Sequence, residues 1–254
     1  MTAKGETLNV KYADVFDTTK EMNDDIIFTV RYKSGSLGIG SPFANTFAPQ
    51  NSGANVITGS GDGKNYNTKE ISAAYSKEDL RKDVSMADSY YDKSKDVEAQ
   101  VAYVKKFLSE VSIRYDAEND WPVIRYADVL LMYAEVLNEV DGPSAGLKYL
   151  NLVRERAGLS KIESDAVTTR NVFRTYLEKE RRLELAFENQ RWFDLLRWGK
   201  AIEVINKHIQ ETEWDFYAGY TQQINKLKDY QLILPIPQSV IDNNPGVITQ
   251  NPNY

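Results

Sequence analysis

Two glutamates one helical turn apart, Glu180 and Glu184, have the spacing in this chain that most readily suggests chemistry. Projected at 100° per residue, both fall within about 20° of the centre of one apolar stripe. That stripe is formed by Phe173, Tyr176, Leu177, Leu183 and Phe187. Two carboxylates on an apolar face could act as an acid/base pair, as in glycoside hydrolysis, or supply half of a metal site.

The alternative is structural, because a buried carboxylate must be paired or neutralised. The neighbouring sequence supplies six arginines: Arg154, Arg156, Arg181, Arg182, Arg191 and Arg197. Asp194 and Arg197 stand at a spacing (i, i+3) that allows an ion pair. We favour an internal charge network that sets how helices dock, formed by Glu180, Glu184, Arg191, Asp194 and Arg197. It predicts that Glu184→Ala lowers the melting temperature sharply and leaves ligand affinity per folded molecule unchanged.

The remaining options for catalysis are few. The chain has no cysteine and one histidine, His208, which removes thiolate chemistry, Cys-based zinc sites and most triads. The glycine-rich segment 35–40 resembles a nucleotide loop only superficially. The segment 62–70 lacks calcium ligands because Lys64 occupies the third position. We therefore predict no catalytic residue, no cofactor and no metal site.

Aromatic residues in irregular segments suggest a different activity, binding. The flat face of an aromatic ring stacks on the C–H face of a sugar, and asparagines hydrogen-bond the hydroxyls. Loop aromatics lie beside Asn45, Asn65 and Asn67 in the sequence: Phe43, Phe47, Tyr66, Tyr75, Trp214, Phe216 and Tyr217. We predict that Phe47, Tyr66 and Tyr75 lie near a ligand surface. The alternative is that each ring pins its loop to the body of the protein.

Composition narrows the class of partner. The 254 residues include 31 Lys and Arg against 37 Asp and Glu, a net charge of −6, which argues against nucleic acid. The longest apolar runs, such as 129–132, are far below the roughly 20 residues of a membrane helix. The N-terminus has no signal-peptide pattern. The chain is expected to be soluble as it stands, and any export signal would lie upstream.

Residues 1–120 are predicted to form a loop-rich region with short strands. A β-branched and aromatic run at 26–32 predicts a strand, and further strands are expected at 84–86 and 101–107. The long polar stretch 33–69 between them is typical of a functional or a disordered loop.

Residues 121–209 have the pattern of helices. Pro122 is expected in the first turn of a helix that continues to Val140, and Ser144 is expected to cap the next helix, residues 145–157. A second pair is predicted at 169–187 and 192–209. Two such pairs are typical of tetratricopeptide-like units, although no 34-residue consensus is present.

Residues 210–254 are predicted to form an irregular tail. The apolar run 230–236 is expected to be extended, and four prolines should keep the tail out of helices. The predicted fold class is mainly α, with tetratricopeptide-like helix pairs and an irregular region carrying a few short strands.

Four sequence blocks, in order, carry a specific resemblance. They are WPVIRYADVLLMYAE at 121–135, LNLVRERAGL at 150–159, ERRLELAFE at 180–188 followed by RWFDL and RWG at 191–199, and LPIP at 234–237 through QNPNY at 250–254. YADVFD at 12–17 and DDIIF at 24–28 extend the match upstream. Together these blocks resemble the SusD/RagB family of outer-membrane, nutrient-binding lipoproteins.

The resemblance implies an α/α superhelix on the surface of a Bacteroidetes-type bacterium. It implies a partner, a SusC-like TonB-dependent transporter, and a ligand, an oligosaccharide held for import while separate enzymes hydrolyse it. Family members are about twice as long, so we expect this chain to be a C-terminal portion, attached to the membrane only through a lipid anchor in the missing N-terminal part. Two alternatives stay open, a scaffold that docks the transporter without binding ligand and a peptide-binding member.

Overall fold

The structure is a computed structural model that describes residue 8, residues 10–211 and residues 225–254. The chain separates into two compact units, Met1–Asn189 and Gln190–Tyr254. This division does not coincide with the sequence-based boundaries after residues 120 and 209, which remain predictions. Trp214, Phe216 and Tyr217, three of the loop aromatics, lie outside the described residues.

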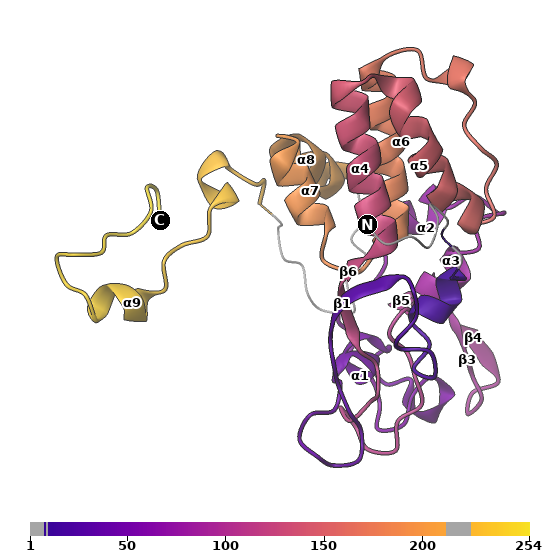
Figure 1. The fold of residues 1–254 in the computed structure, drawn as a ribbon. Helices are drawn as coiled ribbons and strands as arrows, with labels where there is room; N and C mark the ends of the chain where they lie inside the picture. The colour runs from indigo at the N-terminus through magenta and orange to yellow at the C-terminus, as the bar shows by residue number, and fades with distance from the viewer. Residues whose placement is uncertain (1–7, 9, 212–224) are drawn as a thin grey trace. The chain divides into compact units, whose positions relative to one another are not determined.

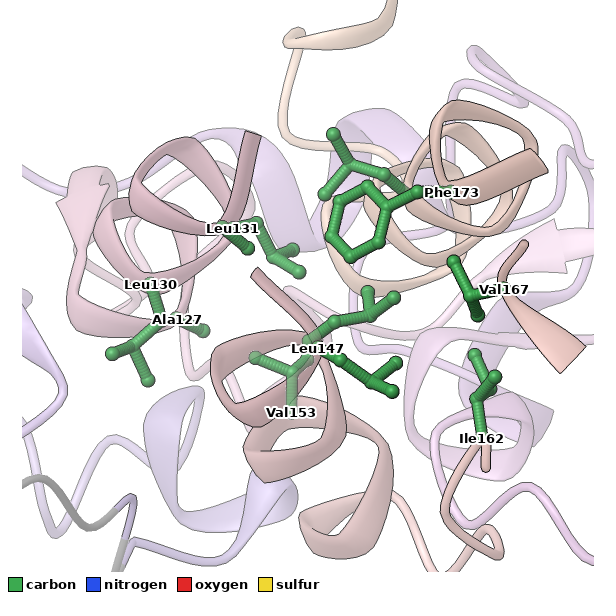
Figure 2. Packing of buried hydrophobic residues seen from close by; sticks show 11 residues of the cluster. Ala127, Leu130, Leu131, Leu147, Val153, Ile162, Val167 and Phe173 are labelled. Carbon is green, nitrogen blue, oxygen red and sulfur yellow. The ribbon is translucent and has the colours of Figure 1, made fainter. Parts of the chain in front are cut away.

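Three helices form the core of the first unit. Helices α4 (Tyr126–Val140), α5 (Pro143–Arg156) and α6 (Arg170–Glu184) lie side by side above the loop-rich region (Figure 1). Figure 2 shows the apolar side chains of all three helices pointing into a common centre, with Val167 and Ile162 joining them from the connection between α5 and α6. The buried members of this cluster are Ala127, Leu130, Leu131, Ala134, Leu147, Leu150, Val153, Ile162, Val167, Phe173 and Leu177.

Helices α4 and α5 approach each other closely at Gly146. A Cβ atom at this position would meet the carbonyl oxygen of Ala134 and lie 2.7 Å from Cζ of Phe173. Because glycine has no Cβ atom, the two helices and the Phe173 ring can pack against one another at this point.

Gly146→Val should force these elements apart. Overpacking of a well-packed core costs about 1–3 kcal/mol, and here backbone as well as a ring must move. We expect urea unfolding to show a loss of stability in or above that range. The matched variant Gly142→Ala changes a glycine whose added Cβ would have nothing within 4 Å, although its φ of +99° would be strained. Equal losses for the two variants would contradict the close-packing argument.

Helix α4 begins later than its sequence predicts. Pro122 lies in strand β6 (Trp121–Arg125), and the helix begins at Tyr126, so the expectation of Pro122 in a first helical turn is wrong. The reason is a distant partner: β6 pairs antiparallel with β1 (Ile26–Val30). The backbone N–H of Tyr126 donates to the carbonyl oxygen of Asp25, and that of Ala127 to its carboxylate, so Asp25 caps the helix.

The start of α5 also differs from expectation. Ser144 is not the N-cap, because the helix begins at Pro143 and Gly142 occupies the cap position with φ of +99°. Proline suits the first helical position because its fixed φ is already helical and it has no N–H to satisfy. At the other end Gly158 adopts φ of +79°, as expected for a residue that terminates a helix.

The rest of the first unit consists of loops and short elements. The strand expected at 26–32 is confirmed as β1, whereas segment 84–86 lies mostly in a helix and segment 101–107 contributes a strand of two residues. Besides β1–β6, the described residues contain the two-stranded pairs β2 (Met86–Ala87) with β5 (Tyr103–Val104), and β3 (Tyr90–Asp92) with β4 (Val97–Ala99). Short helices are α1 (Phe43–Phe47), α2 (Lys69–Ala74), α3 (Lys82–Ser85) and the 3₁₀ turns Tyr12–Val15, Gly53–Asn55 and Ser164–Ala166.

The long polar stretch after β1 is held by one buried side chain. The amide of Asn45 donates to the carbonyl oxygens of Thr58 and Ser60, each at 2.9 Å. Its side-chain oxygen accepts from the backbone N–H of Tyr115 at 2.9 Å. The asparagine therefore ties three segments together and gives the stretch a defined path.

The second unit contains two helices where the sequence predicts one. Helix α7 (Arg191–Arg197) ends before Gly199, whose φ is +67°, and α8 (Ala201–Glu211) follows. The prediction of a continuous helix at 192–209 is therefore wrong, because a left-handed glycine interrupts it.

The tail is not free of helices either. A 3₁₀ turn (Asp229–Leu232) and α9 (Gln238–Asp242) are present, and Pro237 directly precedes α9. The expectation of a helix-free tail is therefore wrong, since proline is tolerated where a helix begins. The run 230–236 starts within the 3₁₀ turn and leaves it at Ile233, whose backbone is extended.

Hydrogen bonds join two segments of the tail, residues 234–236 and residues 250–251. The side chain of Gln250 accepts from the backbone N–H of Ile236 at 2.8 Å and donates to its carbonyl oxygen at 2.9 Å. Asn251 donates to the carbonyl oxygen of Leu234 at 2.8 Å. The LPIP and QNPNY blocks of the sequence are thus joined in space. The predicted fold class, mainly α with a few short strands, is confirmed. Among the described helices, none has the length and apolar character to cross a membrane.

Candidate ligand-binding site

A network of buried charges lies in the first unit, where the loop-rich region meets the helices. The C-terminal half of α6 faces it, and the other members come from α5, the end of β6 and loops far apart in sequence. Its cations are Arg81, Lys106, Arg125, Arg154 and Arg156, and its anions are Asp25, Asp79, Glu180, Glu184 and Glu188. The five cations face five anions, so the formal charges balance.

Every carboxylate oxygen of Glu180 and Glu184 is engaged by an arginine. The two oxygens of Glu180 accept from Arg81 at 2.6 Å and from Arg154 at 3.0 Å. One oxygen of Glu184 accepts from Arg125 at 3.0 Å and from Arg156, and the other accepts from Arg81 at 3.1 Å. The two residues are 1% and 0% exposed. No oxygen of either carboxylate is left to act on a substrate or to bind a metal.

Arg125 is the centre of the network. Its guanidinium donates to both oxygens of Glu188, at 2.8 and 2.9 Å. It also reaches Asp25 at 2.9 Å and the backbone carbonyl oxygen of Glu184 at 3.1 Å. The planar, five-donor guanidinium suits this role because it can satisfy several acceptors in fixed directions.

The network also satisfies the carbonyl groups at the end of α6, which have no partner within the helix. The Tyr75 hydroxyl donates to the carbonyl oxygen of Leu183 at 2.8 Å, and the Tyr12 hydroxyl donates to that of Glu184 at 3.1 Å. The ammonium of Lys106 also donates to the carbonyl oxygen of Glu184 at 3.5 Å, and to that of Ala186, just after the helix, at 2.7 Å. Cations at a helix C-terminus are also favoured by the helix dipole.

Burial and neighbouring charge shift the titration of these groups. For Glu184 burial opposes ionisation, but Arg156, Arg125 and Arg81 outweigh it and hold the carboxyl pKa well below its ordinary value. Burial lowers the pKa of Lys106, and Glu188 acts against that shift. Burial raises the pKa of the phenols of Tyr12 and Tyr75, which therefore stay neutral donors.

Because of Glu184, the free energy of unfolding is expected to depend on pH in the acidic range. Its folded-state pKa lies below the unfolded value of about 4.3. Its contribution is therefore complete above that value and is lost as the pH falls towards the folded-state pKa. We expect the free energy of unfolding, measured in urea, to fall between pH 5 and pH 3, and to fall less steeply in Glu184→Gln. Identical slopes for both proteins would contradict this assignment.

The residues predicted for the charge network are distributed between both units. Glu180 and Glu184 lie in the buried network, while Arg191, Asp194 and Arg197 belong to the second unit. There Arg197 donates to Asp194 at 2.9 Å, the pairing that their spacing suggests. Five members of the network lie far from α6 in the sequence and were missed: Asp25, Asp79, Arg81, Lys106 and Arg125. Of these, Asp25 and Arg125 lie within recognised sequence blocks.

The three predicted ligand aromatics have different surroundings. Tyr75 is 5% exposed and its hydroxyl binds the end of α6, so its expected place at a ligand surface is wrong: the ring is part of the core. Phe47 is half-buried and stacks with Phe43, with ring centroids 5.8 Å apart. Tyr66 is half-buried as well, and a Cβ on Gly63 would collide with its hydroxyl. Phe47 and Tyr66 remain candidates for ligand contact.

Phe47 belongs to a larger aromatic cluster around the buried ring of Phe107. Trp121 stacks on Phe107 with a centroid distance of 4.6 Å and an interplanar angle of 18°. Phe43 and Phe47 lie 6.1 and 6.0 Å from the same ring. Phe16 meets Phe107 edge-on at 5.9 Å. The cluster joins helix α1 to Phe16, the residue that follows the 3₁₀ turn at Tyr12–Val15.

A cavity of about 480 Å³ opens beside Phe16. It lies between the turn that follows Tyr12–Val15 and the turn that follows β5. Its lining mixes one aromatic ring with hydroxyl, carboxylate and ammonium groups: Ala13, Phe16, Asp17, Thr18, Thr19, Val84, Lys105, Lys106, Leu108, Ser109, Glu110 and Glu118. The composition suits a ligand with both apolar faces and hydroxyl groups. Within the described part of the chain, no cluster of three or more Asp, Glu or His side chains is arranged to hold a metal.

Comparison with known proteins decides the family. The sequence model of the SusD family matches residues 26–254. This chain belongs to the SusD family. A SusD-like protein of Formosa agariphila is 28% identical over 93% of this chain and 50% of its own length. The resemblance carried by the four sequence blocks is thereby confirmed.

Solved structures of the SusD family share the fold. Surface glycan-binding protein A from Bacteroides thetaiotaomicron matches 99% of this chain and 57% of its own, with a TM-score of 0.75 and 25% identity. The same protein in complex with laminarihexaose matches with a TM-score of 0.74. The chain spans about half the length of these SusD relatives. The SusD-like fold class is confirmed.

Proposed function

We propose that this chain binds oligosaccharide at the cell surface and does so without catalysis. The observation that carries the proposal is the match, over 99% of the chain, to a surface glycan-binding protein. A structure of that relative holds laminarihexaose, a neutral oligosaccharide. Membership of the SusD family supports the same class of ligand.

The geometry of the first unit is compatible with this activity. The two carboxylates that could have formed a hydrolytic pair are enclosed by arginines. The cavity beside Phe16 and the half-buried rings of Phe47 and Tyr66 offer the aromatic and hydrogen-bonding groups that sugars require. The chemistry that these groups support is binding.

We extend the proposal to the cellular setting that the family implies. The bound glycan is passed to a SusC-like TonB-dependent transporter for import. There the protein acts as a cell-surface lipoprotein of the outer membrane. Copurification with a transporter of this kind, from membranes of the source bacterium, tests the partnership.

Titration calorimetry with neutral hexasaccharides tests the ligand class. Laminarihexaose, cellohexaose and maltohexaose form the panel, and hexaglycine is the control for peptide binding. We expect saturable binding of at least one glycan and none of hexaglycine. Absence of binding across the glycan panel would contradict the proposal and favour a scaffold. Binding of hexaglycine alone would favour a peptide-binding member of the family.

A further inference from the structure

Tyr115 is a surface aromatic residue with an unusual backbone conformation. Its φ is +64°, in the left-handed region that glycine and asparagine tolerate and that bulky side chains rarely adopt. The residue is 40% exposed, so burial of its side chain compensates only in part for this conformation. Strained backbone is concentrated at binding sites, where the surrounding structure holds it in place. Tyr115 is therefore a candidate for ligand contact.

The backbone of Tyr115 is held by the stretch that follows α1 and by α1 itself. Its N–H donates to the side-chain oxygen of Asn45 at 2.9 Å. The preceding residue, Arg114, packs against Gly59 so closely that a Cβ atom on the glycine would lie 2.9 Å from the Cβ of Arg114. These contacts fix the position from which the Tyr115 ring extends.

The hydroxyl group of Tyr115 is fixed as well. It donates to Oδ1 of Asp62 at 2.7 Å. This hydrogen bond is the largest of the causes that lower the pKa of Asp62, so the carboxyl is ionised at neutral pH and acts as an acceptor. The turn that carries Asp62 is tied to α1, because the backbone N–H groups of residues 62–64 donate to carbonyl oxygens of residues 45–48 at 2.9–3.0 Å. A ring ordered in advance saves the entropy that ordering on binding would cost.

The groups around the ring suit a sugar. The guanidinium of Arg114 lies over one face of Tyr115, 4.6 Å from the ring centre, which leaves the opposite face for a ligand. Asp62 accepts from one nitrogen of this guanidinium, and a guanidinium has five N–H donors, so donors remain for hydroxyl groups. Tyr66 lies against Gly63, directly beside Asp62. Two tyrosines therefore approach the same turn.

The Tyr115 ring belongs to an exposed surface. Residues 112–115 are all exposed, and the side chain of Arg114 is 44% exposed. A sugar chain that lies on such a surface can continue past the ring in both directions. Recognition of a chain end requires, in contrast, groups that enclose the end. The geometry therefore favours contact with residues inside a glycan chain.

We infer that Tyr115 is a stacking residue of the glycan site and that it contacts a sugar ring within the chain rather than at its end. The inference rests on the proposed function and adds the residue that carries affinity and the part of the glycan that is bound. Asp62 and Asn45 are positioning residues, since they act through Tyr115. The ligand also explains the strained backbone, because a residue better suited to this conformation would lack the ring.

Tyr115→Asn separates binding from folding. Asparagine tolerates the left-handed conformation, so the melting temperature should stay the same or rise. Loss of the ring should weaken binding of the tightest hexasaccharide of the panel by about tenfold or more, as measured by titration calorimetry. A residue that only pins its loop would give the opposite result, a lower melting temperature with unchanged affinity.

Tyr91→Asn is the matched control. Tyr91 is 49% exposed and its hydroxyl also donates to an aspartate, Asp96, but it lies in strand β3. This variant should keep the affinity of the unaltered protein. The same hexasaccharide is then titrated after borohydride reduction, which opens its terminal ring. A site that binds within the chain should give equal affinities for the two forms.

The outcomes separate the two proposals. If the unaltered protein binds a glycan and Tyr115→Asn binds it equally well, Tyr115 is not a stacking residue, while the proposed function stands. Weaker binding together with a lower melting temperature would support the contact and overturn the explanation of the strained backbone. Binding of the reduced hexasaccharide that is tenfold weaker would overturn contact within the chain. If the unaltered protein binds no glycan, the proposed function and this inference both fall. A Tyr115→Asn variant that does not fold is replaced by Tyr115→Gly, since glycine adopts positive φ freely.

Discussion

Glu184→Gln is expected to lower the free energy of unfolding by about 3–5 kcal/mol, because it leaves Arg81, Arg125 and Arg156 without their shared counter-charge in a buried site. Glutamine keeps the volume of the side chain, so the loss reports charge and hydrogen bonding rather than a cavity. Urea unfolding at pH 7 measures the loss. Melting should fall by roughly 10 °C, given about 2–4 °C per kcal/mol for a chain of this size. Glu184→Ala should lose at least as much.

The matched control is Glu139→Gln. Glu139 pairs with Arg174 on the surface, where both side chains are more than a third exposed. Surface ion pairs contribute about 0–1 kcal/mol, so this variant should unfold almost like the unaltered protein. Ligand affinity per folded molecule should be the same for Glu184→Gln and the control. Normal stability with lost binding in Glu184→Gln would mean that the carboxylate serves the ligand instead.

Arg125→Met is expected to be equally costly, about 3–5 kcal/mol, because Asp25, Glu184 and Glu188 all lose a donor. Arg125→Lys separates charge from geometry. A lysine keeps the positive charge but offers a compact ammonium in place of a planar fork. It should therefore recover less than half of the stability that methionine loses, as measured by urea unfolding of both variants.

Arg114→Met is the control for this pair of variants. Arg114 contacts Asp62 at 2.5 Å, but its side chain is 44% exposed. The loss should stay within about 1 kcal/mol. Full rescue by Arg125→Lys would show that net charge alone holds the site, and a mild effect of Arg125→Met would show that the network is dispensable.

The sequence predicts the helices of this fold well where a local pattern decides them. The apolar spacing in α4 to α6, Gly158 at the end of α5 and Thr169 at the start of α6 are all readable from neighbouring residues. The start of α4 is not, because strand pairing with residues 26–30 and capping by Asp25 set it from about 100 positions away. The preference of proline for the first turn of a helix therefore predicts a helix at a position that lies in a strand.

The site is less predictable than the fold for the same reason. Apolar spacing on α6 predicts that Glu180 and Glu184 are buried, and burial requires partners. It does not say that Arg81 is one of them, since nothing near Arg81 in sequence indicates its partner 99 positions later. Tyr75 shows the converse error: its position in a polar segment suggests a surface ring, yet its hydroxyl satisfies a helix end in the core.

Titration of the protein with laminarihexaose, followed by assay of the same mixture for new reducing ends, tests the central claim that this SusD-family chain binds glycan without cleaving it. We expect saturable binding with one set of sites and a reducing-end signal that stays at the level of the protein-free control. Reducing ends that increase with time and protein concentration would contradict it, because the carboxylates enclosed by arginines would then have to be replaced by a catalytic pair elsewhere.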